Sequence, residues 1–327
     1  MYTIKRFANL EAMQPIWQRL EQNSFHYPFQ SWHYLKLFSD HFCKESDLIL
    51  VGIEDNNTTL ALAAFERIGQ HVLWLGMKPV LGKEEITDFG DLLYSPDSIK
   101  KANVIQAIWR LLFSYLRTLG INQMQLDYLR WDSPSMTYLQ TQAHEQATQE
   151  TSPFILLQNT WDEYLTLLSR VDRKELKRKL KRLDSQKPEY ELCQTITSTD
   201  MADFIKLHRL SDPAKNQFMS APMARFFQDL VKKPLGMWQS QLYFLNIANQ
   251  RVAAVLLFIN SSHILLYNSG YHPSFAYYSV GLLLKARLIQ IAIESRLQVF
   301  DFLRGNERYK YDLGARDLVL KQLRINL

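Results

Sequence analysis

The sequence has 327 residues, of which 47% are hydrophobic and 22% charged. These values are typical of a globular protein with a sizeable core, and the length suggests about two domains. The formal net charge is +5. The longest apolar run, Leu282–Ile293, is interrupted by Lys285 and Arg287, which argues against a membrane span.

The N-terminal segment and the cysteines indicate the compartment. Met1–Arg6 leads into a predicted helix that contains Glu11, so we expect no secretory signal. Cys43 and Cys193 lie far apart and form no metal-binding spacing. We therefore expect two buried thiols in a reducing compartment, hence a cytoplasmic protein, with the inner face of the membrane as one place of action.

The first half alternates helices and strands, and hydrophobic periodicity locates them. The expected elements are a strand at Tyr2–Ala8, helices at Asn9–Asn23 and Trp32–Phe42, strands at Leu48–Ile53, Leu60–Arg67 and His71–Leu75, a long loop at Gly76–Asp97, a helix at Lys100–Leu119 and a strand at Gln123–Tyr128. The polar segment Trp131–Ser152 follows, and we place the domain junction there, between domains 1–140 and 141–327.

The second half repeats this order. The expected elements are a strand at Phe154–Leu157, a helix from about Thr160 that ends before Pro188, helices at Thr199–Ser211 and Ala221–Lys232, strands at Leu242–Ile247, Val252–Ile259 and Ile264–Asn268, a buried helix at Leu282–Glu294 and a strand at Leu297–Leu303. Each half would be a mixed sheet flanked by helices. The sequence therefore predicts an α/β protein, with mixed sheets, built from two similar domains.

The positive charge is concentrated in one helix. Arg170–Arg182 contains eight cations and two acids, a net charge of +6, which exceeds that of the whole chain. Leu176, Leu180 and Leu183 give this helix an apolar side. Its charged side is either a solvated face or a contact for a phosphate-rich partner such as tRNA, a nucleotide-sugar or an anionic membrane.

A second candidate site lies at the start of the buried helix. The backbone amides near Ser279, Val280 and Gly281 would stand at a helix N-terminus, which suits a pyrophosphate. The alternative is an ordinary helix cap by Ser279. No glycine-rich fingerprint or P-loop occurs, and no Ser-His-Asp or metal-ligand spacing stands out, so we expect no metal site.

Several segments together resemble a known family. They are Asn268–Pro273, Ser279–Leu284 and Phe300–Lys310, with the basic run Leu176–Leu183 after Ser169-Arg170, and the short segments Leu207–Arg209 and Pro28–Ser31. They resemble the CelD/BcsL-type acetyltransferases of bacterial envelope and exopolysaccharide clusters. These form a branch of the GNAT superfamily related to the FemAB peptidoglycan aminoacyltransferases. The usual GNAT phosphate signature is absent, and Tyr277–Gly281 stands in its place.

The resemblance implies a fold and an activity. The fold would be two tandem GNAT-like domains, as in FemAB proteins. The activity would be that of an N-acyltransferase, with acyl-CoA (acetyl-CoA) as co-substrate and an amine such as an amino sugar as acceptor, in envelope or exopolysaccharide biosynthesis. One alternative is an aminoacyl-tRNA-dependent transferase acting on a peptidoglycan precursor. Another is a non-catalytic protein that docks through its basic helix.

The implied chemistry assigns roles to the polar run that follows the last predicted strand. Acyl transfer to an amine needs a base, an oxyanion donor and an acid for the leaving thiolate. The expected catalytic residues are Asp301 and Glu307 as bases, Tyr309 as the acid, with Tyr271 as its alternative, and Lys310 for developing negative charge. Arg304 would join Ser279, Val280 and Gly281 in binding the donor.

The remaining candidates would bind substrate. They are Arg170, Lys177, Arg178, His208, Tyr271 and His272, with core or turn positions as the alternative for the two histidines. The alternative for the catalytic set is a structural network that pairs Asp301 with Arg304, and Glu307 with Lys310, and ties the loop to the sheet.

Overall fold

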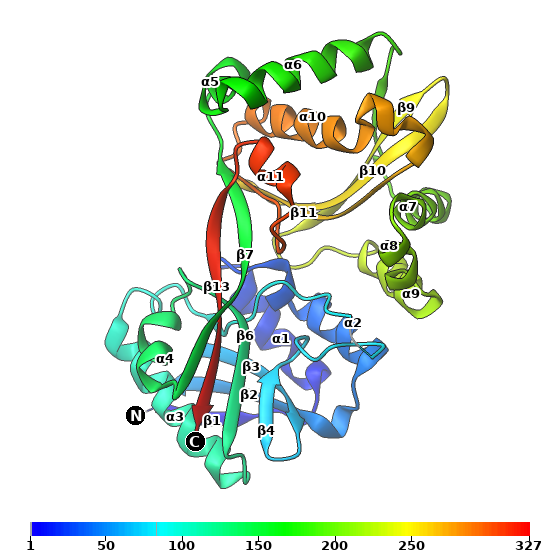
Figure 1. The fold of residues 1–327 in the computed structure, drawn as a ribbon. Helices are drawn as coiled ribbons and strands as arrows, with labels where there is room; N and C mark the ends of the chain where they lie inside the picture. The colour runs from blue at the N-terminus through cyan, green and yellow to red at the C-terminus, as the bar shows by residue number, and fades with distance from the viewer. Residues whose placement is uncertain (1, 83) are drawn as a thin grey trace. The chain divides into compact units, whose positions relative to one another are not determined.

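The computed structural model describes residues 2–82 and 84–327, which form two compact units. Unit 1 comprises the residues up to Glu150 together with Leu235–Met237 and Leu318–Leu327. Unit 2 comprises Thr151–Pro234 and Trp238–Asp317. Each unit combines a mixed sheet with helices, as the hydrophobic patterns predict (Figure 1). Within the described ranges, no helix reaches the length and apolarity needed to cross a membrane.

Unit 1 is built on strands in the spatial order β1-β2-β3-β4-β6-β13, with β5 paired to β3. Its strands are β1 (Tyr2–Arg6), β2 (Leu48–Asp55), β3 (Thr58–Ile68), β4 (His71–Trp74), β5 (Leu93–Tyr94), β6 (Gln123–Arg130) and, from Leu318 on, β13 (Arg316–Asn326). Its helices are α1 (Leu10–Glu21), η1 (Pro28–Gln30), α2 (Trp32–Phe42), η2 (Glu45–Asp47), α3 (Ala102–Thr118) and α4 (Met136–Gln142). Strands β4 and β6 run parallel, and α3 lies between them in sequence. Ile108, Trp109 and Leu112 of α3 are fully buried, which gives the helix its place in the core.

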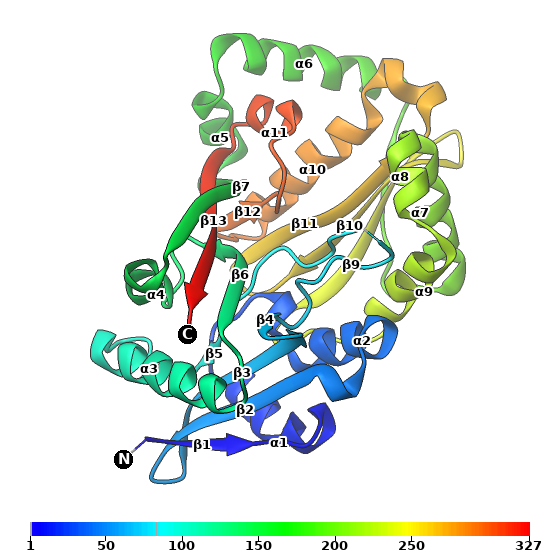
Figure 2. The same cartoon turned by 60° about the horizontal axis from the view of Figure 1, so that its bottom comes forward.

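Unit 2 has the strand order β7-β12-β11-β10-β9-β8. Its strands are β7 (Glu145–Leu156, from Thr151 on), β8 (Glu189–Leu192), β9 (Gln239–Ile247), β10 (Gln250–Ile259), β11 (His263–Tyr271) and β12 (Val299–Asp301). Its helices are α5 (Trp161–Leu167), α6 (Arg170–Asp184), α7 (Ser198–Ser211), α8 (Pro213–Phe218), α9 (Ala221–Leu230), η3 (Pro273–Tyr278), α10 (Val280–Glu294) and α11 (Arg308–Asp312). Strands β11 and β12 run parallel and are joined through η3 and α10 (Figure 2).

Helix α10 is the buried helix that its sequence predicts. Its Leu283, Leu288 and Ile289 are fully buried in the core of unit 2. An apolar surface on almost every side is what a helix in a parallel crossover requires, because the sheet covers one side and neighbouring helices cover the other.

Several elements differ from their predictions. The helix expected from Thr160 to Pro188 is two helices, because Leu168 is extended and Ser169 begins α6 by accepting a hydrogen bond from the Asp172 amide. The polar segment 131–152 contains α4 and most of β7 instead of a linker. Strands β8 and β13 and helix α8 had no predicted counterpart. The two cysteines are half-buried free thiols, not fully buried ones.

The chain passes from unit 1 to unit 2 inside strand β7, between Glu150 and Thr151. It returns to unit 1 inside β13. The domains 1–140 and 141–327 stay a prediction, because compact units group residues by contact and do not show where a GNAT-like repeat begins.

Gly270 of β11 sets the distance between the sheet of unit 2 and helix α7. A Cβ atom at this position would lie 2.3 Å from the backbone nitrogen of His208, which is closer than any non-bonded contact allows. The backbone of α7 therefore rests directly on β11 at Gly270, and no side chain fits between them.

We expect the substitution Gly270→Ala to destabilise unit 2 by roughly 1–3 kcal/mol, because the added methyl group must push α7 away from the sheet. Urea unfolding of the variant and the wild type measures this difference. Ser269→Ala, one residue earlier on the same strand, is the control and should change the free energy of unfolding by less than about 0.5 kcal/mol. Equal stability of Gly270→Ala and wild type would contradict the close packing.

Candidate functional site

A cavity of about 530 Å³ lies within unit 2. Its walls come from the end of β11, the start of α10 and the loop between β12 and α11, with Lys179 of α6 and Lys215 of α8 added from outside this crossover. A site beyond strand ends and at a helix N-terminus is the place that the sequence predicts for a ligand.

The N-terminus of α10 faces this cavity without a side-chain cap. Ser279 takes the left-handed conformation (φ 57°), and its side chain does not accept from the helix amides. Its hydroxyl oxygen instead accepts from Nη2 of Arg182 at 3.2 Å. The amides of Val280, Gly281 and Leu282 have no carbonyl partner within the helix, because they belong to its first turn. The structure thus differs from the ordinary cap, and the three amides can receive an anion.

Gly281 keeps the approach to these amides narrow but open. A Cβ atom there would lie 3.2 Å from the ring of Tyr271, so a larger side chain would fill the space beside the first turn. Val280, Gly281, Ser279 and Tyr271 all line the cavity, as expected. Their roles in binding a donor stay a prediction.

Lys310 is buried and its ammonium group is fully engaged. The side chain is 2% exposed. Its Nζ donates to the carbonyl oxygens of Leu303 (3.1 Å), Arg304 (2.7 Å) and Gly305 (2.9 Å). It also lies 2.9 Å from a carboxylate oxygen of Glu307. Of the structural network that was the alternative to a catalytic Lys310, this geometry contains the pair of Glu307 and Lys310.

The two candidate carboxylate bases differ in position. Glu307 lines the cavity. Burial tends to raise the pKa of its carboxyl, but the charge and hydrogen bond of Lys310 outweigh this effect and hold the pKa below its ordinary value. Asp301 is buried, accepts hydrogen bonds from Ser152 and the Leu303 amide at 2.8 Å, and is not among the residues that line the cavity. Glu307 therefore lies at the cavity with a lowered pKa and Asp301 lies away from its lining, and their roles as bases stay a prediction.

A base candidate that the sequence did not suggest is Lys285. It is almost fully buried on α10, lines the cavity, and donates from Nζ to the Gly281 carbonyl at 3.1 Å. Burial, and then the positive charge of Lys215, lower its pKa to about 7. Lys310 adds to this effect and Glu307 opposes it. The only signal in the sequence was a lysine within an apolar helix, which had served to exclude a membrane span.

An aromatic residue, Tyr309, and a second lysine, Lys215, also line the cavity. Burial, with the charge of Glu307, raises the pKa of Tyr309, so its hydroxyl stays protonated. The Nζ of Lys285 lies 4.7 Å from the centre of the Tyr309 ring. Lys215 donates to the Ser269 carbonyl at 2.6 Å, and burial lowers its pKa. Lys215 went unnoticed in the sequence because helix α8 was not predicted.

Most of the expected substrate-binding residues lie elsewhere. Of the six, all within the described ranges, only Tyr271 lines the cavity. Arg170, Lys177 and Arg178 are exposed on α6. Their helix reaches the site through two other cations, since Lys179 lines the cavity and Arg182 binds Ser279.

The two histidines lie at a core position and at a turn. His208 is 1% exposed on α7, and burial together with the charge of Lys215 lowers its pKa to about 3. His272 begins η3, where its Nδ1 accepts from the Ser274 amide at 3.3 Å. These are the core and turn positions that were the alternative for both residues.

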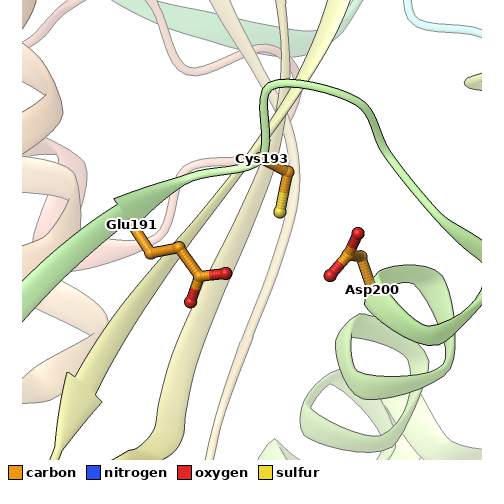
Figure 3. A group of neighbouring side chains, drawn as sticks. All are labelled: Glu191, Cys193 and Asp200. Atoms are coloured by element: carbon orange, nitrogen blue, oxygen red, sulfur yellow. The ribbon is translucent and has the colours of Figure 1, made fainter.

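A second cluster in unit 2 has the composition of a metal site, but its carboxylates are paired with an arginine. Glu191, Cys193 and Asp200 approach one another (Figure 3). Arg251 forms ion pairs with Glu191, with Asp200 (2.8 Å) and with Asp203 (2.9 Å). Burial and the two carboxylates raise the pKa of Cys193 to about 12, so the thiol is protonated. A guanidinium group therefore already balances these carboxylates.

Comparison with protein families identifies a domain at the cavity. Residues 170–311 match the acetyltransferase (GNAT) domain family, and this segment contains every residue that lines the cavity except Asp312. The segment that matches this family therefore lies, apart from Leu235–Met237, within unit 2. No curated protein matches the chain.

Comparison with solved structures shows the fold of the whole chain. FemX matches over 99% of this chain and 97% of its own, with a TM-score of 0.66 and 8% identity. A conserved protein of unknown function from Bacteroides thetaiotaomicron matches over 99% of this chain and 100% of its own, with a TM-score of 0.63 and 12% identity. A tandem GNAT protein from the clavulanic acid biosynthesis pathway matches over 100% of this chain and 98% of its own, with a TM-score of 0.54 and 12% identity. The predicted mixed α/β fold of the tandem GNAT type is confirmed.

The network around Lys310 leads to a prediction about stability. Lys310→Met keeps the volume of the side chain but leaves three carbonyl groups without their donor. We expect it to cost roughly 3–5 kcal/mol, the range for removing one partner of a buried charged contact. Arg308→Ala, two residues earlier and exposed, is the control. Unfolding in urea compares the two variants, and an unchanged midpoint for Lys310→Met would contradict the structural role.

Proposed function

We propose that this protein is an N-acyltransferase that moves an acyl group from acyl-CoA, such as acetyl-CoA, to an amine. The observation that carries the proposal is the uncapped N-terminus of α10, which opens into a cavity lined by Lys179, Lys215 and Arg304. The match of this segment to a GNAT acetyltransferase domain supports it. An amino sugar of envelope or exopolysaccharide biosynthesis as acceptor rests on the resemblance to the CelD/BcsL-type enzymes.

The donor would bind through its phosphates. A pyrophosphate accepts hydrogen bonds from backbone amides at a helix N-terminus, and it gains from cations placed around it. The first-turn amides of α10 and the side chains of Lys179 and Arg304, all from residues that line the cavity, would supply both kinds of contact. The thioester would then extend along the cavity toward Lys285 and Tyr309.

The reaction needs an unprotonated amine and a protonated leaving group. The acceptor amine loses a proton to Nζ of Lys285 and attacks the thioester carbonyl, so that a C–N bond forms. The C–S bond then breaks, the CoA thiolate takes a proton from the Tyr309 hydroxyl, and the Tyr309 oxygen regains a proton from the ammonium group of Lys285, which restores both residues. Burial lowers the pKa of Lys285, so that its amine can be neutral near pH 7, and raises that of Tyr309, so that its hydroxyl stays protonated until the thiolate forms.

Calorimetric titration of the protein with acetyl-CoA tests the donor. We expect binding that weakens by roughly 5- to 100-fold in Lys179→Ala and Arg304→Ala, because each removes a charge-assisted contact worth about 1–3 kcal/mol. Lys174→Ala, exposed on the same helix as Lys179, is the matched control. A phosphate-free thioester, S-acetyl-N-acetylcysteamine, should bind far more weakly. Equal affinity for both thioesters would refute donor binding through the phosphates.

The pH dependence of acyl transfer tests Lys285. The side chain accepts a proton only when it is neutral, so kcat/KM should rise with pH through about 7 and then level off. Lys285→Arg stays protonated and should lose this rise together with most of the activity. A profile that keeps its midpoint in Lys285→Arg would remove Lys285 from the mechanism.

Lys285→Met supplies a separate readout of the same group. A buried amine whose pKa lies below its unfolded value of about 10.4 costs stability, fully below pH 7 and less at higher pH. The variant should therefore be more stable than the wild type below about pH 7, with a difference that narrows as the pH rises. Urea unfolding at several pH values measures this difference, and a constant difference would contradict the lowered pKa.

A further inference from the structure

Helix α6 carries a cationic face that the cavity does not use. At 100° per residue, five exposed cations project within an arc of about 100°. They are Arg170, Lys174, Lys177, Arg178 and Lys181. No acid lies within this arc between the first and the last of them. Glu175, at the side of the arc, pairs with one of the five, Arg178, at 2.7 Å.

The opposite side of α6 fixes the direction of this face. Leu176 and Leu183 are buried in the core of unit 2, and Leu180 packs against the same core. Both views of the fold show α6 as the outer layer of unit 2, lying over α10 (Figures 1 and 2). The cationic face is therefore turned away from the core and cannot be absorbed by packing within unit 2.

Apolar side chains are exposed at both ends of this face. Val171 is 75% exposed at the first turn of α6, and Leu167 is 55% exposed just before it. Tyr277 is 68% exposed near the other end, where the guanidinium group of Arg182 lies 4.5 Å from its ring centre. Folding leaves these three side chains in water, although burying them elsewhere would be favourable.

We propose that the exposed face of α6, with Leu167, Val171 and Tyr277, docks unit 2 on an anionic membrane surface. Cations attract the charged headgroups, and apolar side chains beside them insert at the boundary with the acyl chains. A nucleic acid would be attracted by the same charges, but the exposed aliphatic side chains of Leu167 and Val171 would gain nothing from a phosphate backbone. The aliphatic pair therefore favours the membrane.

Sedimentation with lipid vesicles tests the proposal. We expect the protein to bind vesicles of mixed phosphatidylcholine and phosphatidylglycerol but not those of phosphatidylcholine alone. Binding should fall steeply in 1 M salt, because the screening length shrinks from about 8 Å to about 3 Å. Equal binding to both kinds of vesicle, or to neither, would overturn the proposal.

Two charge-reversal variants, one on α6 and one at α3, distinguish binding through the α6 face from an effect of the overall charge. Lys174→Glu, Lys177→Glu and Lys181→Glu together should weaken binding to the anionic vesicles by at least about tenfold. The control combines Lys101→Glu, Arg110→Glu and Arg117→Glu at exposed positions in and just before α3, and should keep most of the binding. Both sets leave the core untouched, so the thermal midpoint should stay unchanged. An equal loss in the two variants would overturn the assignment to α6.

Substitution of Leu167 and Val171 distinguishes a membrane partner from a nucleic acid. Leu167→Ser with Val171→Ser should weaken binding to the anionic vesicles and leave any binding of bulk tRNA unchanged. Binding of tRNA without binding of anionic vesicles would replace the membrane by a nucleic acid and overturn the proposal. These measurements need neither acyl donor nor acceptor, so their outcome is independent of the proposed acyl transfer.

Discussion

The three backbone carbonyls bound by the ammonium group of Lys310 hold in place the loop on which the candidate site depends. This loop leaves the sheet after β12 with Leu303 at positive φ, a conformation that a residue with a branched side chain adopts reluctantly. The bound loop presents Arg304 and Glu307 to the cavity. Lys310 thereby contributes to the site through the shape of the backbone, whichever groups carry out the chemistry.

The cavity gathers more positive than negative charge before any ligand arrives. Lys179, Lys215, Lys285 and Arg304 line it with the N-terminus of α10, against the carboxylates of Glu307 and Asp312. The fold tolerates this excess partly because a lysine with a lowered pKa carries less positive charge. Burial and the charge of Lys215 lower the pKa of Lys285, and burial lowers the pKa of Lys215. A site of this kind is arranged for an anion, since an anionic ligand would relieve the repulsion that folding leaves in place.

Local patterns predicted the parts of the fold that local physics determines. The apolar helix α10 and the three sequential strands of each half follow from hydrophobic periodicity. Strand β13 was not predicted because its register shifts between Lys321 and Leu323, which breaks the alternation of buried residues along the strand.

The candidate site was less predictable than the fold. The sequence singled out Lys310, but only tertiary structure shows that all its donors are taken by carbonyl groups. It passed over Lys285, because the burial that lowers the pKa of a lysine comes from packing against distant residues. It named the exposed cations of α6 rather than Lys179, since the leucine spacing shows which side of the helix is apolar but not which cation lines a cavity.

The position of β13 in the chain affects how unit 1 can form during synthesis. Its residues from Leu318 on pair with β6, whose Leu126 and Leu129 are fully buried, yet they leave the ribosome only after unit 2 has been made. Until then β6 has one open edge that can pair with other chains. A nascent chain that stalls before Leu318 would expose this edge, so unit 1 depends on the later synthesis of β13, or on a chaperone, to avoid pairing with other chains.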